Sequence, residues 1–247
     1  MRMSFHRIAY EALEVCNALE MTAVEAAVAR ADLPAGARAL DIGCGNAAVS
    51  IRLAQRFGLD VTAVELDPVM ADLAEARIAA SGAPVCLVRG SSGDVLAASA
   101  PFDLIVAIGT TRPAGGDLVE PADVLPVLTE ALTPGGRLLW GDLTWRADPA
   151  APLRQVVEAS NRYLDDAGWR ATFEAAGLEV VTASISSDQT WDRYTTAMAE
   201  AARGWLDAHP DSPEANGVRT AAGRVAAMFD FGRPWLDFGL YLARRGA

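Results

Sequence analysis

Short apolar runs alternate along the chain with longer stretches whose apolar residues recur at helical spacing. The runs have the length of β-strands, and the longer stretches have the period of amphipathic helices. Strands are predicted at residues 38–42, 61–65, 85–89, 102–108, 137–142, 178–183 and 235–243. Helical patterns fill most of the intervals, and Gly or Pro marks many junctions. This order predicts an α/β protein with a doubly wound sheet.

The first and last intervals depart from this simple alternation. Residues 1–35 form a helical segment whose apolar stripe breaks near residues 17–22. Residues 184–235 separate the last two strands and carry two amphipathic patterns, one through Tyr194, Met198, Ala201, Trp205 and Ala208, the other through Val218, Ala221, Val225 and Met228. We expect two helices that cap the active-site edge of the sheet. The alternative is that they pack against the outer helices of the sheet.

The chain is therefore predicted to be a single domain, residues 1–247. Its parts are an N-terminal helical segment, a core, a helical cap insertion and a last strand, at residues 1–35, 36–183, 184–235 and 236–247. A length of 247 residues, 51% of them hydrophobic and 21% charged, is typical of one sizeable globular domain. The net charge of −11 would repel a phosphate backbone, and no cluster of Lys and Arg offsets it, so we expect no nucleic-acid partner.

The rarer residue types exclude other classes. Cys16, Cys44 and Cys86 are far apart and odd in number, which favours reduced thiols over a disulfide framework. His6 and His209 are the only histidines, and no Cys/His pair has metal-ligand spacing, so no metal site is expected. No segment has the pattern of a signal peptide or the length of a membrane span. These features predict a cytoplasmic protein with no membrane partner.

The most informative stretch is 39–48, Ala-Leu-Asp-Ile-Gly-Cys-Gly-Asn-Ala-Ala. A strand ending near Asp41, a turn containing Gly43 and Gly45, and a following helix form a nucleotide-binding corner. The glycines allow the backbone to turn sharply and to approach a ligand closely. The N-terminus of the helix beyond them offers free N–H groups.

An acid ends the second predicted strand twenty residues beyond Gly45. Glu65 at that point is suited to bind the two hydroxyls of a ribose. A dinucleotide and S-adenosylmethionine both fit this arrangement. Asp41 favours S-adenosylmethionine, because a carboxylate repels a diphosphate but attracts a sulfonium and an ammonium.

Three segments resemble class I S-adenosylmethionine-dependent methyltransferases. Asp-Ile-Gly-Cys-Gly resembles their first motif, Val-Glu-Leu-Asp-Pro their second, and Leu-Thr-Pro-Gly-Gly-Arg-Leu-Leu the turn before their fifth strand. Residues 36–183 follow the order of the family, and the insertion with Trp191-Asp-Arg-Tyr194 resembles a poorly characterised bacterial group that acts on small molecules. The resemblance implies a seven-stranded, mostly parallel sheet with an antiparallel last strand.

The resemblance also implies which residues bind S-adenosylmethionine. They are Asp41, Gly43, Gly45, Glu65, Leu66, Ser91, Ser92 and Ile108. The family commonly has Gly-Asp-Ala after the third strand, where the acid meets the adenine amino group. This chain has Ser91 in the place of the acid, so a serine hydroxyl, the nearby Asp94, or neither performs that role.

The acceptor is expected beyond the carboxyl ends of the strands, as in other open α/β sheets. Residues 109–113, Gly-Thr-Thr-Arg-Pro, lack the Asn/Asp-Pro-Pro-aromatic motif of amino-group methyltransferases of nucleobases or glutamine. Asp142 is a candidate to orient or deprotonate the acceptor, or else a turn former, and Tyr194 is a candidate to pack against the acceptor. Other candidates to bind substrate are Arg112, Trp145, Tyr163, Tyr10 and His6.

Three functions remain open from the sequence. The first is methyl transfer to a small molecule, with the acceptor atom undetermined among O, N, S and C. The second is aminopropyl transfer or cyclisation of the donor on the same fold, and the third is a binding domain without catalysis. An NAD-dependent enzyme is disfavoured by Asp41. The oligomeric state is also open, with a homodimer as one option.

Overall fold

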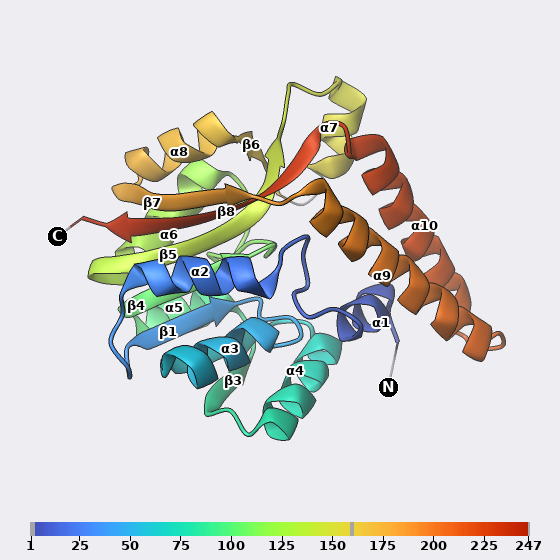
Figure 1. Cartoon of the computed structure of the whole chain (residues 1–247), viewed down its shortest axis with the longest axis horizontal. Coiled ribbons are helices and arrows are strands. Elements are labelled where there is room, and N and C mark those ends of the chain that lie inside the picture. Colours follow the sequence, from blue (N-terminus) through green and yellow to red (C-terminus); the bar gives the residue numbers. More distant parts are fainter. Residues whose placement is uncertain (1–2, 159–160, 247) are drawn as a thin grey trace.

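The computed structural model describes residues 3–158 and 161–246, which form eighteen helices and strands (Figure 1). The helices are α1 (Phe5–Glu11), α2 (Met21–Ala31), α3 (Ala48–Phe57), α4 (Pro68–Ser81), α5 (Ser92–Ser99), α6 (Pro121–Glu130), α7 (Ala151–Val157), α8 (Asp166–Ala175), α9 (Asp188–Ala208) and α10 (Ala215–Gly232). The strands are β1 (Arg38–Ile42), β2 (Asp60–Glu65), β3 (Val85–Arg89), β4 (Phe102–Ile108), β5 (Leu132–Trp145), β6 (Leu164–Asp165), β7 (Leu178–Ile185) and β8 (Leu236–Arg245).

The sheet confirms the predicted doubly wound topology. Its order is β3-β2-β1-β4-β5-β8-β7, and β8 is antiparallel to both of its neighbours. The two-residue strand β6 pairs with β5 outside this path and was not predicted. The chain winds outward from β1 in one direction and from β4 in the other. A crevice is expected at the carboxyl ends of β1 and β4, because the connections diverge there.

The alternation of side chains along the strands divides the core into two layers. On β4, Leu104 and Val106 belong to the hydrophobic cluster that also contains α2 and α3. Ile105 and Ala107, which point to the opposite face, belong to the cluster with α5, α6 and α8. Both faces of the sheet are therefore covered by helices, which explains the uninterrupted apolar run of β4.

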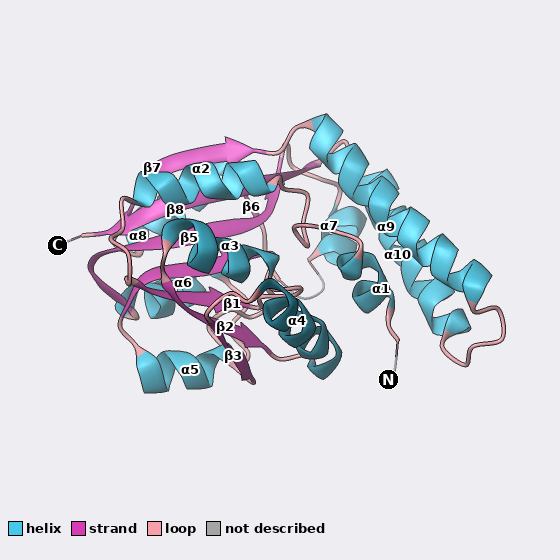
Figure 2. Ribbon diagram, turned by 60° about the horizontal axis from the view of Figure 1, so that its bottom comes forward, coloured by secondary structure: helices cyan, strands magenta, loops and turns pink. Residues whose placement is uncertain are grey.

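The predicted cap is a helical hairpin. Helices α9 and α10 lie side by side and extend beyond the ends of the strands, with α1 packed against α9 (Figures 1 and 2). Trp191, Tyr194 and Met198 on α9 are buried in the cluster that also holds α2. The inner face of α9 is thus continuous with the core of the sheet.

The fifth strand is longer than its sequence predicts. We expected a strand over 137–142 that ends at Asp142, but β5 continues to Trp145. The reason is the partner strand, since β8 pairs with β5 from Arg137 to Trp145 and places Gly239 opposite Asp142. Asp142 therefore lies within a hydrogen-bonded strand and not at its end.

The N-terminal segment is fastened to the glycine turn by Asn46. Its buried side chain donates from Nδ2 to the carbonyls of Tyr10 and Leu13, at 3.0 and 2.9 Å, and accepts from the N–H of Ala48 at 3.0 Å. Arg77 on α4 adds a bond to the carbonyl of Glu11 at 2.6 Å. The turn after β1 thus also positions the chain between α1 and α2.

We expect Asn46→Ala to lower the free energy of unfolding by about 1–3 kcal/mol, because it removes a buried side chain that makes several hydrogen bonds to the backbone. Urea unfolding followed by circular dichroism measures this loss. Gln55→Ala is the control, since it removes an exposed bond to the carbonyl of Ser81 and should cost about 0.5 kcal/mol or less. Equal losses in the two variants would contradict the role assigned to Asn46.

Candidate active site

The glycine turn after β1 is held against the end of β4. Gly43 has a φ of +65°, and a Cβ at this position would lie 2.7 Å from Thr110 Oγ1. The Thr110 hydroxyl itself donates to the carbonyl of Ile42 at 2.7 Å. Only glycine meets both the left-handed backbone and this close approach without displacing Thr110.

Glu65 is oriented by two backbone donors. Its carboxylate accepts from Gly45 N and from Asp67 N, each at 2.9 Å. Burial raises the pKa of Glu65, and the two N–H groups partly offset that effect. A carboxylate has about four acceptor positions, so part of this capacity remains for a ligand.

Asp41 lies behind the turn. It is 4% exposed and accepts from Ser50 Oγ at 2.5 Å, and burial raises its pKa to about 6. Its side chain does not line the cavity in front of the turn. The structure therefore places Asp41 where it supports the site through α3. Direct contact with the donor remains a prediction.

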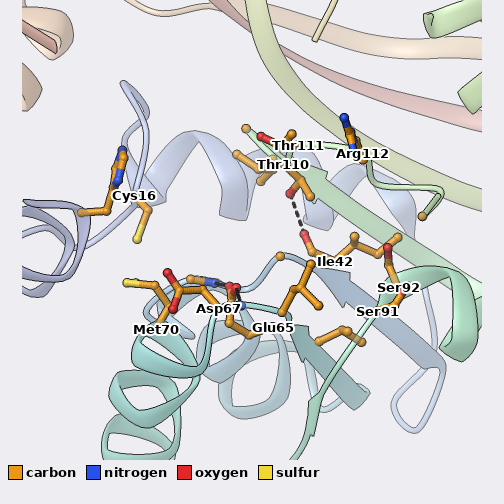
Figure 3. A pocket seen from close by; sticks show the side chains of 18 of the residues that line it. Cys16, Ile42, Glu65, Asp67, Met70, Ser91, Ser92, Thr110, Thr111 and Arg112 are labelled. Atoms are coloured by element: carbon orange, nitrogen blue, oxygen red, sulfur yellow. Dashed lines mark hydrogen bonds between the residues drawn. The ribbon is translucent and has the colours of Figure 1, made fainter. Parts of the chain in front are cut away.

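A cavity of about 730 Å³ opens at the carboxyl ends of β1 to β4. It brings together every predicted cofactor residue except Asp41, namely Gly43, Gly45, Glu65, Leu66, Ser91, Ser92 and Ile108. Figure 3 shows Glu65 and Asp67 on one side of it, with Ser91 and Ser92 farther along and Thr110 to Arg112 opposite. Its walls thus come from the ends of four adjacent strands.

The serine that replaces the family's acid caps a helix. Ser91 Oγ accepts from Gly93 N at 3.2 Å at the start of α5, which leaves its hydroxyl hydrogen free to donate. Asp94 is exposed and does not line the cavity. Of the two candidates for the adenine contact, the structure therefore brings only Ser91 to the cavity.

The N-terminal segment closes one side of the same cavity. His6 and Tyr10, both predicted substrate residues, line it from α1. Burial lowers the pKa of His6, which the charge of Asp67 partly opposes. Arg112 also lines the cavity, but it is exposed and paired with Asp117 at 3.2 Å.

A second cavity of about 100 Å³ adjoins the first. The two share Asn17, Gly109 and Thr111 as lining residues. Asp142, Tyr163 and Tyr194 line the smaller one, which the aromatic side chains of Trp191, Phe229 and Phe238 also enclose. The structure thus brings three of the predicted acceptor residues together next to the larger cavity.

Asp142 is an isolated buried carboxyl. It is 5% exposed, and among the described residues only Leu143 N donates to it, at 2.9 Å. Burial raises the pKa of Asp142 to about 8. Burial also raises the pKa of Tyr163, and the charge of Asp142 adds to that rise. Burial therefore favours the neutral form of Asp142, and the carboxyl is placed to exchange a proton with a group in the small cavity.

Tyr194 connects the cap to the N-terminal segment. Its hydroxyl interacts with that of Tyr10, and burial raises the pKa of both phenols, that of Tyr10 to about 12. The ring of Tyr194 packs edge-on against Trp191 and Phe229, with centroids 6.2 and 5.9 Å away. Tyr194 therefore points inward, as expected.

Trp145 is placed elsewhere. It packs with Val157 and Leu236 in a separate cluster, and its Nε1 donates to Glu158 at 3.0 Å. It lines neither cavity, because the longer β5 carries it three residues beyond Asp142. A role for Trp145 in substrate binding has no support in this arrangement.

Asn17 was not identified from the sequence. Its Nδ2 donates to the carbonyl of Ile108 at 3.2 Å, and a Cβ on Gly109 would lie 2.2 Å from Asn17 Oδ1. The only sequence signal was the break in the helical stripe near 17–22. Cys16 and Asn161 were also missed, and each lines one of the two cavities.

The described part of the chain gives no sign of metal or of a membrane span. Within residues 3–158 and 161–246, no group of three or more His, Cys, Asp or Glu could hold a metal ion. Among the described helices, none combines the length and the apolarity needed to cross a bilayer.

The sheet is doubly wound, its strand β8 is antiparallel, and a cavity lies where the strand order reverses. These features together define the Rossmann-like methyltransferase fold. Residues 39–136 match the protein family described as "Methyltransferase domain". The uncharacterized protein YjhP of Escherichia coli K12 is 29% identical over 189 residues, 74% of each chain. A ubiquinone biosynthesis O-methyltransferase of Xanthomonas axonopodis pv. citri is 33% identical over 144 residues, 58% of this chain and 57% of that protein.

Solved structures agree over almost the whole chain. A methyltransferase from Thiobacillus denitrificans, in complex with S-adenosyl-L-homocysteine, superposes with a TM-score of 0.82 at 25% identity, covering 98% of this chain and 99% of that one. The match to this family and the likeness to a structure that holds S-adenosyl-L-homocysteine indicate a class I S-adenosylmethionine-dependent methyltransferase, in agreement with the motifs.

The pKa of Asp142 predicts a dependence of stability on pH. An unfolded Asp titrates near pH 4, so between about pH 4 and pH 8 the folded state binds one more proton than the unfolded state. The contribution of Asp142 to the free energy of unfolding therefore falls as pH rises, by up to about 1.4 kcal/mol per pH unit.

Asp142→Asn removes this titration, so the variant should gain stability relative to the wild type between pH 5.5 and 8. Urea unfolding at both pH values measures the change, and Asp207→Asn, on the exposed side of α9, is the control. A stability difference that is the same at both pH values would show that the carboxyl titrates normally.

Proposed function

We propose that the chain transfers the methyl group of S-adenosylmethionine to a small-molecule nucleophile held in the smaller cavity. The observation that supports this most is the junction of the two cavities at Asn17, Gly109 and Thr111. One cavity has the groups expected to bind the donor, and the other holds an isolated carboxyl under the cap. Donor and acceptor would therefore meet beyond the end of β4.

The larger cavity fits the donor. The free acceptor positions of Glu65 suit the two ribose hydroxyls, and the backbone turn at Gly43 and Gly45 permits close approach of the methionine portion. The hydroxyl of Ser91 suits a nitrogen acceptor on adenine. The bound S-adenosyl-L-homocysteine of the Thiobacillus denitrificans enzyme supports the same occupant here.

The reaction needs little from the protein beyond positioning and a proton acceptor. The nucleophile forms a bond to the methyl carbon as the bond between that carbon and sulfur breaks, and the electron pair stays on sulfur to give a neutral thioether. A protonated nucleophile also loses its hydrogen, for which Asp142 in its carboxylate form is the acceptor. Tyr194 and Phe229 exclude water from this step.

The proposal is tested by incubating the protein with S-adenosylmethionine labelled at the methyl group and a panel of phenols, carboxylic acids, amines and thiols. Formation of S-adenosylhomocysteine with a labelled product is expected. The O-methyltransferase relative makes phenols the first class to try. Release of methylthioadenosine would instead indicate aminopropyl transfer or cyclisation, and donor binding without turnover on any class would indicate a binding domain.

Glu65→Ala should weaken binding of S-adenosylmethionine by about 2–3 kcal/mol, the scale of losing charge-assisted hydrogen bonds. Isothermal titration calorimetry measures the affinity. Asp60→Ala, at the exposed opposite end of β2, should bind like the wild type. If Glu65→Ala kept full affinity, the ribose would have to lie elsewhere.

Asp142→Asn should lower kcat by about 10²–10⁴ if the carboxylate takes the proton, the usual contribution of a positioned base. The kcat/KM of the wild type for S-adenosylmethionine should then rise with pH up to about 8, where the carboxyl of the free enzyme ionises, and the variant should lose that rise. A loss confined to KM would instead show that Asp142 only positions the acceptor.

Tyr194→Phe should have a mild effect on turnover and Tyr194→Ala a severe one, because the ring packs against Trp191 and Phe229 while the hydroxyl contacts only Tyr10. Steady-state kinetics with the identified acceptor compare the two variants. Equal losses in both would assign the function to the hydroxyl, and no loss in either would place the acceptor outside this cavity.

A further inference from the structure

A third hollow, distinct from the two cavities described above, adjoins Phe229. It is a groove of about 480 Å³ between α9 and α10, closed at one end by Phe5 of α1. Its walls are mostly apolar and include Met198, Ala202, Leu206, Ala222, Val225 and Ala226. Phe229 lines this groove and also the small cavity that contains Asp142. The groove therefore adjoins the proposed acceptor site, with the Phe229 side chain as their common wall.

The apolar face of α10 is incompletely covered. Of its eighteen residues only Ala215, Val218 and Gly232 are buried. Val225 and Phe229, in the middle of its apolar stripe, are only partly buried. The hairpin extends beyond the ends of the strands in both views (Figures 1 and 2), and the helices α1 and α7 both contact α10.

The small cavity cannot hold a whole acceptor. Its volume of about 100 Å³ is far below the roughly 300–1,000 Å³ of sites that enclose a drug-sized ligand. It has room for the reacting group, while the larger cavity is taken by the donor. The remainder of the acceptor must therefore extend out of the small cavity on another side. The apolar groove begins at Phe229, which lines one side of that cavity.

We propose that the groove between α9 and α10 binds a hydrocarbon tail of the acceptor. The acceptor class is then an amphipathic small molecule, with a nucleophilic head group beside Asp142 and an alkyl or similar chain beyond Phe229. This inference rests on the proposed function for the head group. Its own evidence is the mostly apolar lining of the groove and the Phe229 wall that it shares with the acceptor cavity.

The test uses 4-n-alkylphenols from methyl to octyl, titrated into the full chain in the presence of S-adenosylhomocysteine. Each methylene buried in the groove should raise the affinity about fourfold until the groove is filled. Calorimetry measures the dissociation constants, at concentrations below those at which the phenols form micelles.

Two neighbouring alanines on α10 provide a matched pair of variants. Ala226 and Ala227 are both exposed, but only Ala226 lines the groove. Ala226→Trp should fill the groove and abolish the gain with chain length, while leaving the affinity for 4-methylphenol unchanged. Ala227→Trp should retain the wild-type series.

The inference is overturned by an affinity that does not rise with chain length, by failure of every alkylphenol to bind, or by equal behaviour of Ala226→Trp and Ala227→Trp. None of these results bears on methyl transfer itself, which is measured separately by the formation of S-adenosylhomocysteine. Conversely, a rise in affinity without any turnover would support the groove and contradict the proposed function.

Discussion

The active site depends on the close approach of the turns that follow β1 and β4. These adjacent parallel strands send their chains in opposite directions, and the Thr110 hydroxyl bridges them by donating to the carbonyl of Ile42. The approach is possible because Gly43 has no side chain to collide with Thr110. The donor cavity and the small cavity both open at this contact, since Gly109 and Thr111 line each of them. A single backbone constraint thus determines where the two cavities meet.

The N-terminal segment joins the two halves of the site. Asn46 holds the carbonyls of Tyr10 and Leu13, and so places Asn17 against the carbonyl of Ile108. The interaction of Tyr10 with Tyr194 then extends the same connection to the cap. Residues from three distant parts of the chain therefore depend on one another, and a change in the cap is expected to be felt at the donor cavity.

The sequence predicted the fold better than it predicted the acceptor side of the site. The strand order follows from apolar runs and glycine turns, which are local signals, and the turn with Gly43 and Gly45 indicated the part of the sheet where the larger cavity lies. The length of β5 was underestimated because it depends on pairing with β8, nearly a hundred residues away, and this error misplaced Trp145. Asn17 and Phe229 carry no motif. Their place in the site depends on how the N-terminal segment and α10 pack, which no local pattern encodes.

The electrostatics of the site link proton transfer to the presence of the donor. Burial favours the protonated form of Asp142, and no cation among the described residues pairs with it. A sulfonium in the adjoining cavity would favour the ionised carboxyl and lower its pKa. The base would then become competent when the donor is bound, and its pKa would rise again when methyl transfer leaves a neutral thioether. Asp142 would thus have two effects. Its burial lowers the free energy of unfolding at high pH, and the positive charge of the bound donor would offset that loss by favouring the carboxylate.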